Sequence, residues 1–222
     1  MKGIIFDLDG TLIDSMTMYR SLSKNYLRKF DIELDEDVAH KLTVMDLATS
    51  INYLIDYYDL KKDPIEVYND YQEMIIDFYS NRVEFKEAAE ETLKHYIEKG
   101  YTLALGTATQ RHLLAHVFKR LELEKYFDYI QSVEDIEISK SKREFFDILA
   151  QKMGVENQEI MVYDDAPYAL VAAKEAGMQT TAVYDVTAEK AWEDMKEKND
   201  YHIKSFKEVL NRWDKFYSFC QE

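Results

Sequence analysis

From residue 102 to residue 203 the sequence alternates between short apolar runs and longer amphipathic segments. Including a run at the N-terminus, strands are expected at residues 3–6, 102–106, 129–133, 160–163, 180–183 and 201–203. Runs this apolar lack polar and apolar alternation, so both faces of each strand should be buried. Because the intervening segments have helical periodicity, successive strands should run parallel. The pattern predicts an α/β fold built on a doubly wound parallel sheet.

One interval, residues 15–83, interrupts this alternation and shows helical periodicity without a convincing strand. Two sets of apolar residues recur at helical spacing: Tyr19, Leu22, Tyr26 and Phe30, then Leu47, Ile51, Leu54 and Tyr58. A further helix should begin at Asp63-Pro64, where aspartate can cap the helix and proline can occupy its first position. The interval predicts a small all-helical domain, residues 15–83, inserted into a core of residues 1–14 and 84–222.

Composition limits the classes of partner. The 222 residues are 46% hydrophobic, which is enough for a sizeable core, and 28 Lys and Arg against 43 Asp and Glu give a net charge of −15. This charge repels polyanions, so nucleic acid is not an expected partner. No stretch resembles a signal peptide or a membrane span, and the sole cysteine, Cys220, is consistent with a reducing compartment. The chain is expected to be cytoplasmic, and its oligomeric state is left open.

Two aspartates follow the first expected strand in the stretch "IIFDLDGTLIDS". Because side chains alternate along a strand, Asp7 and Asp9 should share one side while Leu8 points into the core. Gly10 allows the backbone to turn sharply. Two carboxylates this close raise the pKa of one of them unless a cation or a proton relieves the repulsion. Taken alone, Asp9-Gly10 could equally be a solvated turn.

Residues after the other apolar runs favour a functional site. In an open parallel sheet the carboxyl ends of the strands line one crevice, where ligands bind. The residues expected there, besides Asp7 and Asp9, are Thr107, Asp164, Asp165 and Lys140. Oxygen ligands favour Mg²⁺, and a lysine with a hydroxyl favours a phosphoryl group. The sequence therefore predicts a site for a metal ion and a phosphate.

In chain order, four short motifs resemble those of the haloacid dehalogenase-like (HAD) superfamily. They are Asp7-Leu8-Asp9-Gly10-Thr11, Gly106-Thr107, Lys140 and Asp164-Asp165. Residues 125–130 and 172–178 resemble its connecting segments, and the helical insert resembles the cap domain of its phosphatase and β-phosphoglucomutase branch. The ordered set is far more specific than any one motif. The resemblance implies a Rossmann-like core with a helical cap.

The resemblance also implies residue roles. Asp7 would be the nucleophile that forms an aspartyl-phosphate, and Asp9 the general acid and base. Mg²⁺ would be held by Asp7, the backbone carbonyl of Asp9, Asp165, and Asp164 directly or through water. Thr107, the amide of Ala108, and Lys140 would bind the phosphoryl group. An aspartate at position 9 distinguishes phosphoryl chemistry from dehalogenation, in which no leaving alkoxide needs a proton.

Three departures from the family pattern stand out. The lysine motif reads Lys140-Ser141-Lys142-Arg143-Glu144, and spacing favours Lys140 while Lys142 stays an alternative. Residues 86–88 replace a common Pro-Gly pair at the start of a helix expected over 86–99, which Gly100 should end. No arginine occurs around Thr43-Val44-Met45, where mutase-like caps commonly carry one for a second phosphate.

The expected function is a Mg²⁺-dependent phosphatase acting on a small phosphorylated metabolite, such as a sugar, glycolate or nucleotide phosphate. A sugar phosphomutase is the alternative, although the missing cap arginine and Thr11 favour hydrolysis. An inactive binding protein is the third reading. Of the 17 tyrosines, those in the insert are expected to form a helical core and not a ring-binding pocket. His112 lies near the expected crevice at a solvated helix start.

Overall fold

The computed structural model describes residues 1–42 and 45–216. The chain divides into two compact units, Met1–Met16 with Val83–Glu222, and Thr17–Arg82. The sequence predicts an insert of residues 15–83, and the role of the second unit as a cap stays a prediction. Within the described residues, no helix combines the length and the apolar character needed to cross a membrane.

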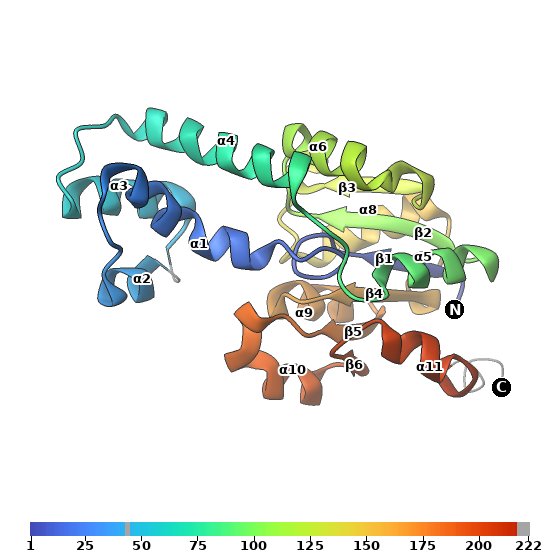
Figure 1. The fold of residues 1–222 in the computed structure, drawn as a ribbon. Coiled ribbons are helices and arrows are strands. Elements are labelled where there is room, and N and C mark those ends of the chain that lie inside the picture. Colours follow the sequence, from blue (N-terminus) through green and yellow to red (C-terminus); the bar gives the residue numbers. More distant parts are fainter. Residues whose placement is uncertain (43–44, 217–222) are drawn as a thin grey trace. The chain divides into compact units, whose positions relative to one another are not determined.

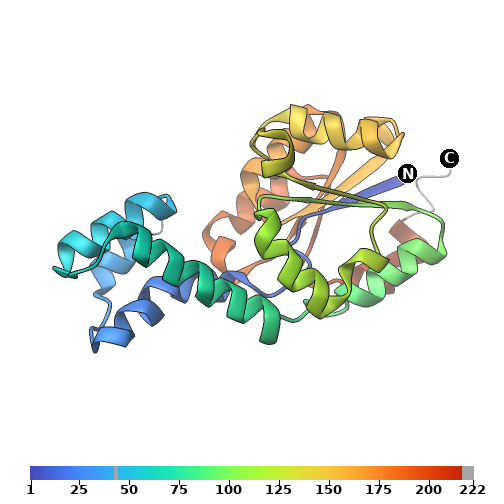
Figure 2. The same cartoon turned by 90° about the horizontal axis from the view of Figure 1, so that it is seen from above.

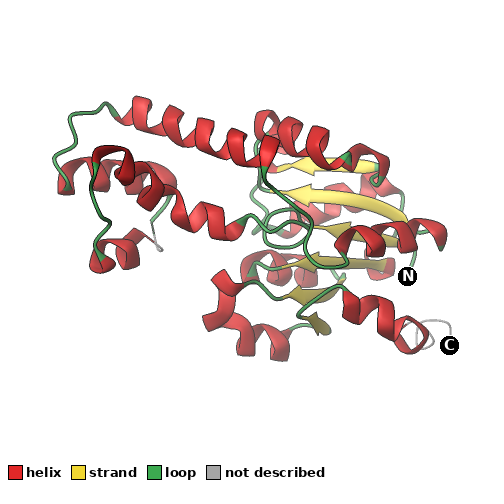
Figure 3. Cartoon of the chain, in the orientation of Figure 1, coloured by secondary structure: helices red, strands yellow, loops and turns green. Residues whose placement is uncertain are grey.

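The first unit contains the predicted parallel sheet, with its six strands in the order β3-β2-β1-β4-β5-β6 (Figure 3). The strands are β1 (Gly3–Phe6), β2 (Thr102–Thr107), β3 (Tyr129–Ser132), β4 (Ile160–Asp164), β5 (Gln179–Val183) and β6 (Tyr201–Ile203). All five pairings are parallel, which confirms the α/β class. Four strand ends differ from expectation by one residue, at β2, β3, β4 and β5. Two of these differences concern the expected site, because Thr107 and Asp164 are the last residues of β2 and β4 and do not follow them.

The strand order creates a switch point beside β1. The chain moves outward from β1 through β2 to β3, and then crosses back to place β4 on the other side of β1 (Figure 1). Phe6 is in register with Leu105 on β2 and with Tyr163 on β4. The register therefore brings the residue after Phe6 level with the end of β4, at the edge where open α/β sheets bind ligands.

Helices cover both faces of this sheet, as Figure 2 shows. They are α5 (Ala89–Glu98), α6 (Arg111–Leu121), α7 (Val133–Ile136), α8 (Arg143–Met153), α9 (Pro167–Glu175), α10 (Trp192–Lys198) and α11 (Lys207–Phe216). On the α8 and α9 face, Phe145 and Ala169 pack with Ile5 in one apolar cluster. On the opposite face, Phe6 stacks on Tyr163 with ring centroids 4.9 Å apart. Successive residues of β1 thus serve opposite layers.

Helix α5 begins at Ala89, three residues later than the sequence pattern predicts. The amide of Lys86 donates to the carbonyl of Leu12 at 2.8 Å, and Ile13 forms an antiparallel bridge with Phe85. These contacts pair residues 84–86 with the loop after β1, and residues 87 and 88 form a turn before the helix begins. The end of the helix is as expected, because Gly100 takes a positive φ of 80° just after it.

The described residues of the second unit form helices and connecting segments without a strand, as predicted. The helices are α1 (Met16–Leu27, which begins one residue before the unit), α2 (Glu36–Leu42), α3 (Leu47–Tyr57) and α4 (Pro64–Asn81). Asp63 caps α4, and its side chain accepts from the amide of Ile65 at 2.8 Å. Phe30 lies in a short 3₁₀ turn after α1 and is 38% exposed, so it does not extend the buried face of α1. Thr43 and Val44 lie outside the described residues.

Tyrosines fill much of the space between α1 and α4. The rings of Tyr26 and Tyr71 meet edge to face at 5.3 Å, and both side chains are buried. The hydroxyl of Tyr71 donates to Ser23 at 3.0 Å, and the hydroxyls of Tyr19 and Tyr79 lie 2.9 Å apart. These four tyrosines therefore serve as helix packing, and the hydroxyls of Tyr19, Tyr71 and Tyr79 have hydrogen-bond partners, which supports the expectation of a helical core over a ring-binding pocket.

Candidate active site

The loop after β1 is closed by hydrogen bonds to one carbonyl. The oxygen of Leu8 accepts from the amides of Thr11, Leu12 and Ile13 at 3.3, 2.9 and 3.1 Å. Gly10 takes a φ of 81°, and a Cβ on it would lie 2.3 Å from Oδ2 of Asp165. Only glycine fits here, because the loop backbone must lie directly against that carboxylate.

Three buried carboxylates form a cluster at the ends of β1 and β4. Asp7, Asp164 and Asp165 each offer an oxygen, and these oxygens lie within 4.8 Å of one another. Lys140 is 3% exposed, and its Nζ lies 2.5 Å from Oδ1 of Asp7 and 2.7 Å from Oδ2 of Asp164. The hydroxyl of Thr11 donates to Oδ1 of Asp165 at 3.0 Å. We call Asp7, Asp164 and Asp165 the acid cluster.

Burial disfavours the charged forms of these four ionisable side chains. Burial raises the pKa of Asp164 to about 6, against the attraction of Lys140 and with added repulsion from Asp7. Burial, and then the charges of Asp7 and Asp164, also raise the pKa of Asp165 well above its usual range. Burial disfavours the charged form of Lys140, but the two carboxylates outweigh it and raise the lysine pKa. One lysine thus faces three acids, and the surplus negative charge with oxygen-only ligands fits a hard divalent cation.

Asp9 has a different environment from the acid cluster. Its Oδ1 accepts from the hydroxyl of Ser15 at 2.6 Å, and its Oδ2 accepts from the hydroxyl of Thr109. Both oxygens are thus held by hydroxyl donors. The side chain belongs to a hydrogen-bond network beside the cluster, which suits a residue that handles a proton.

Two of the expected phosphate-binding residues lie at the end of β2 and directly after it. Thr107 is 1% exposed, and its hydroxyl accepts from the amide of Thr109 at 3.0 Å. Ala108 is exposed. Lys142 and His112 are exposed as well, whereas Lys140 is buried within the acid cluster. The geometry therefore favours Lys140 over Lys142 as the lysine of the site.

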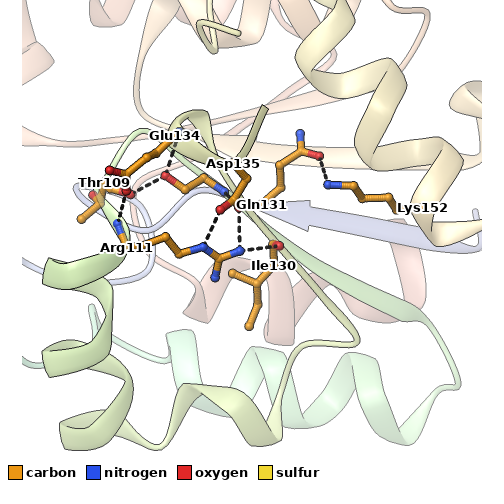
Figure 4. Close-up of polar contacts among 8 residues, drawn as sticks. Thr109, Arg111, Ile130, Gln131, Glu134, Asp135 and Lys152 are labelled. Atoms are coloured by element: carbon orange, nitrogen blue, oxygen red, sulfur yellow. Dashed lines mark hydrogen bonds and ion pairs between the residues drawn. The ribbon is translucent and has the colours of Figure 1, made fainter. Parts of the chain in front are cut away.

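Sequence reasoning missed the network that supports this loop, which Figure 4 draws. The carbonyl of Thr109 accepts from the hydroxyl of Ser132 at 2.7 Å. The guanidinium of Arg111 donates to both carboxylate oxygens of Asp135 at 2.6 Å, and its backbone amide donates to Glu134 at 2.8 Å. Asp135 also accepts from the amide of Ser132 at 2.7 Å and closes a capping box at the start of α7. The hydrogen bonds of Arg111 therefore stabilise the loop between β2 and α6.

A short-range signal for part of this network exists in the sequence. Ser132 followed three residues later by Asp135 has the form of a capping box. The partner, Arg111, is separated from Asp135 by 24 residues, and only the parallel pairing of β2 with β3 brings the two together.

The fold and this site define a Rossmann-like α/β core in which buried acids and a lysine meet at the ends of β1 and β4. The sequence profile of the haloacid dehalogenase-like hydrolases matches residues 4–183. The chain belongs to this family, as the ordered motifs predict, and is therefore an enzyme of the hydrolase class.

Individual relatives are distant but cover most of the chain. Pyrophosphatase PpaX of Oceanobacillus iheyensis is 23% identical over 95% of this chain and 95% of its own length. A phosphorylated carbohydrates phosphatase of Thermotoga maritima is 23% identical over 81% of this chain and 83% of its own length. Among solved structures, one of a Thermotoga maritima protein covers 97% of this chain and 99% of its own, with a TM-score of 0.83 and 21% identity. That likeness shows the fold alone.

Proposed function

We propose that the protein is a Mg²⁺-dependent phosphatase that hydrolyses a small phosphomonoester through an aspartyl-phosphate on Asp7. The observation that carries this proposal is the acid cluster, in which Lys140 forms ion pairs with both Asp7 and Asp164. A buried lysine between Asp7 and Asp164 provides a positive charge where a phosphoryl group must be held, beside the carboxylate that attacks it. Homology to named phosphatases and pyrophosphatases supports the same reaction class.

Asp7 would act as the nucleophile in the first chemical step. An oxygen of its carboxylate attacks phosphorus and forms the aspartyl-phosphate, while the bond from phosphorus to the ester oxygen breaks. Lys140 stabilises the negative charge on the phosphoryl oxygens. Thr107 and the amide of Ala108 bind the same oxygens from the loop after β2.

Asp9 would handle the proton in both steps. In protonated form it gives its proton to the departing ester oxygen, so the alcohol leaves neutral. The resulting carboxylate then takes a proton from the water that attacks the aspartyl-phosphate, and this releases phosphate and regenerates Asp7. The hydroxyls of Ser15 and Thr109 hold the carboxylate in place.

The acid cluster fits Mg²⁺ as the resident cation. Asp7, Asp165 and the backbone carbonyl of Asp9 would hold it, with Asp164 bound directly or through water. When bound, Mg²⁺ neutralises part of the charge of the acids and the phosphate and orients the phosphoryl oxygens. The fit rests on three buried carboxylates, of which only Asp7 and Asp164 contact Lys140.

The substrate is proposed to be a small phosphorylated metabolite. A net charge of −15 repels large polyanions, and a local cation site is needed to admit a small one. The helical unit, Thr17–Arg82, is proposed to act as the cap that selects the substrate. Names of the relatives make sugar phosphates and pyrophosphate the first compounds to test.

Phosphate release from a chromogenic aryl phosphate, with and without Mg²⁺, tests this proposal. A panel of sugar, nucleotide and glycolate phosphates with pyrophosphate then defines the substrate. Asp7→Asn should reduce turnover to background without unfolding the protein, because the amide is not a nucleophile. Asp14→Asn is the matched control, since Asp14 belongs to the same stretch but is exposed.

Two results would overturn the proposal. A folded protein that releases no phosphate from any compound in the presence of Mg²⁺ is not the proposed phosphatase. A requirement for catalytic sugar bisphosphate, with a product that keeps its phosphate, would assign the protein as a phosphomutase.

A further inference from the structure

We infer that Lys86 is a positioning residue of the active site, because its ammonium group ties the loop that carries Asp7 and Asp9 to the end of β5. This inference rests on the proposed function. Lys86 is the first of the residues that replace the common Pro-Gly pair of the family. It matches no motif, so the sequence did not predict a role for it.

The ammonium group of Lys86 has three acceptors on two different segments. It donates to the carbonyl of Gly10, to the carbonyl of Tyr184 at 3.0 Å, and to Oδ2 of Asp185 at 2.8 Å. An ammonium has three hydrogens, so these bonds use its full capacity. The side chain of Lys86 is 18% exposed and that of Asp185 is 3% exposed, so the pair lies largely out of solvent.

The backbone around Lys86 strengthens this connection. Its amide donates to the carbonyl of Leu12 at 2.8 Å, and the amide of Asp14 donates to the carbonyl of Glu84 at 3.1 Å. The segment before α5 thus runs along the loop after β1, and the Lys86 side chain fixes that loop at a third point, Gly10.

Gly10 transmits this constraint to the acid cluster. Its α-carbon is so close to Asp165 that a Cβ would lie 2.3 Å from Oδ2. The next residue, Thr11, donates its hydroxyl to Oδ1 of the same carboxylate at 3.0 Å. If the Gly10 carbonyl changed its orientation, the Gly10 backbone and the Thr11 hydroxyl would move with it. Both lie against the carboxylate of Asp165 and orient it. Partners that orient metal ligands typically affect metal affinity or activity about 10-fold to 100-fold.

The positive charge of Lys86 also acts on the site at longer range. Lys86 lowers the pKa of Asp165, although burial and the neighbouring acids dominate and raise it overall. Lys86 is thus a second positive charge, besides Lys140, that acts on the acid cluster. Removing Lys86 would leave the acid cluster with a larger surplus of negative charge.

Two variants and one control test this role. Lys86→Met keeps the reach of the side chain but removes its charge and its donors. Because this substitution leaves Asp185 buried without its cation, Lys86→Met with Asp185→Asn is the second variant, in which Thr187 still donates to position 185. Lys207→Met is the control, since Lys207 pairs with Glu87, the residue beside Lys86, and is 60% exposed.

The measurements are kcat, KM, the Mg²⁺ concentration for half-maximal activity, and the shift in thermal midpoint that Mg²⁺ produces. We expect the double variant to recover much of the stability lost by Lys86→Met. We also expect it to need at least about 10-fold more Mg²⁺, with kcat lowered by a similar factor. Lys207→Met should behave as wild type in every assay.

The outcomes separate this inference from the function on which it rests. If the double variant melts and responds to Mg²⁺ as wild type does, Lys86 is only the partner of Asp185 and the inference is wrong. If Lys207→Met shows the same kinetic loss, the turn and not the tie to Gly10 is responsible, and the inference is also wrong. A wild-type protein without phosphatase activity contradicts the proposed function, and the Mg²⁺-induced thermal shift of the variants still decides the role of Lys86.

Discussion

Lys140 lies between two carboxylates that are far from it and from each other in the sequence, Asp7 and Asp164. All three side chains are at most 10% exposed, so each charge depends on the others for its stability. Removing one partner from a buried charge pair typically costs about 3 to 5 kcal/mol, because the remaining charge stays uncompensated. The lysine therefore contributes to folding as well as to the proposed chemistry.

Lys140→Met should lower the free energy of unfolding by about 3 to 5 kcal/mol and reduce phosphatase activity to near background. Lys142→Met should change stability by less than about 0.5 kcal/mol, because Lys142 is exposed. Urea denaturation monitored by circular dichroism measures both values, and aryl phosphate turnover measures activity. If Lys142→Met loses more activity than Lys140→Met, Lys142 and not Lys140 is the lysine that binds the phosphate.

At the scale of elements, the loop between β2 and α6 depends on α7. Arg111, at the first turn of α6, forms a bidentate hydrogen bond with Asp135 on α7. The hydroxyl of Ser132, at the end of β3, donates to the carbonyl of Thr109. Hydrogen bonds from Arg111 lower the pKa of Asp135, and its partial burial opposes this effect. The short helix α7 thus fixes the loop that presents Thr107 and Ala108.

Arg111→Lys should lower the free energy of unfolding by about 1 kcal/mol at pH 7, because lysine cannot donate to both oxygens of Asp135. The pKa of Asp135 is lower in the folded protein than in the unfolded chain. The contribution is therefore fully present above the unfolded value of about 3.9 and disappears as the pH falls through the folded value. The stabilities of wild type and variant should accordingly begin to converge only as the pH falls below about 4, and become equal below the folded pKa of Asp135.

The control for this experiment is Arg143→Lys, in which an arginine pairs with Asp147 one turn along the same exposed helix face. It should lose less than about 0.5 kcal/mol at pH 7. An equal loss in the two variants, or a difference between Arg111→Lys and wild type that persists at low pH, would contradict the assignment. Urea denaturation over a pH series provides the measurement.

At the scale of the whole molecule, a net charge of −15 is combined with a concentrated acid cluster in one unit. Any salt should screen the general repulsion among surface carboxylates. Only a cation bound at the cluster should also relieve the repulsion among Asp7, Asp164 and Asp165. The two effects can be separated by comparing ions at equal ionic strength.

Mg²⁺ at about 100 times its dissociation constant should add about 2.7 kcal/mol to the stability of the folded protein. For a chain of this size that corresponds to a rise of roughly 5 to 10 °C in the thermal midpoint. KCl at equal ionic strength should give a smaller rise, and Asp165→Asn should reduce the Mg²⁺ effect to the KCl value. A wild-type response equal in the two salts would contradict a specific metal site at the cluster.

The sequence by itself determined the parallel sheet and the chemical character of the residues at its edge. Apolar runs must be buried on both faces, and this requirement located all six strands to within a residue at each end. The motifs indicated Asp7, Asp9, Thr107, Lys140 and Asp165 because their order along the chain resembles that of the haloacid dehalogenase-like family. Local signals also located the start of α4 at Asp63-Pro64 and the end of α5 at Gly100.

The tertiary structure decided which side chains meet. The bridge from Lys140 to Asp7 spans 133 residues, the bond from Thr109 to Asp9 spans 100, and the contact of Lys86 with Asp185 spans 99. A sequence pattern reports preferences of neighbouring residues, whereas these contacts depend on strand order and register. For this reason the late start of α5, the support of Arg111 by α7 and the position of Lys86 became visible only in the folded chain.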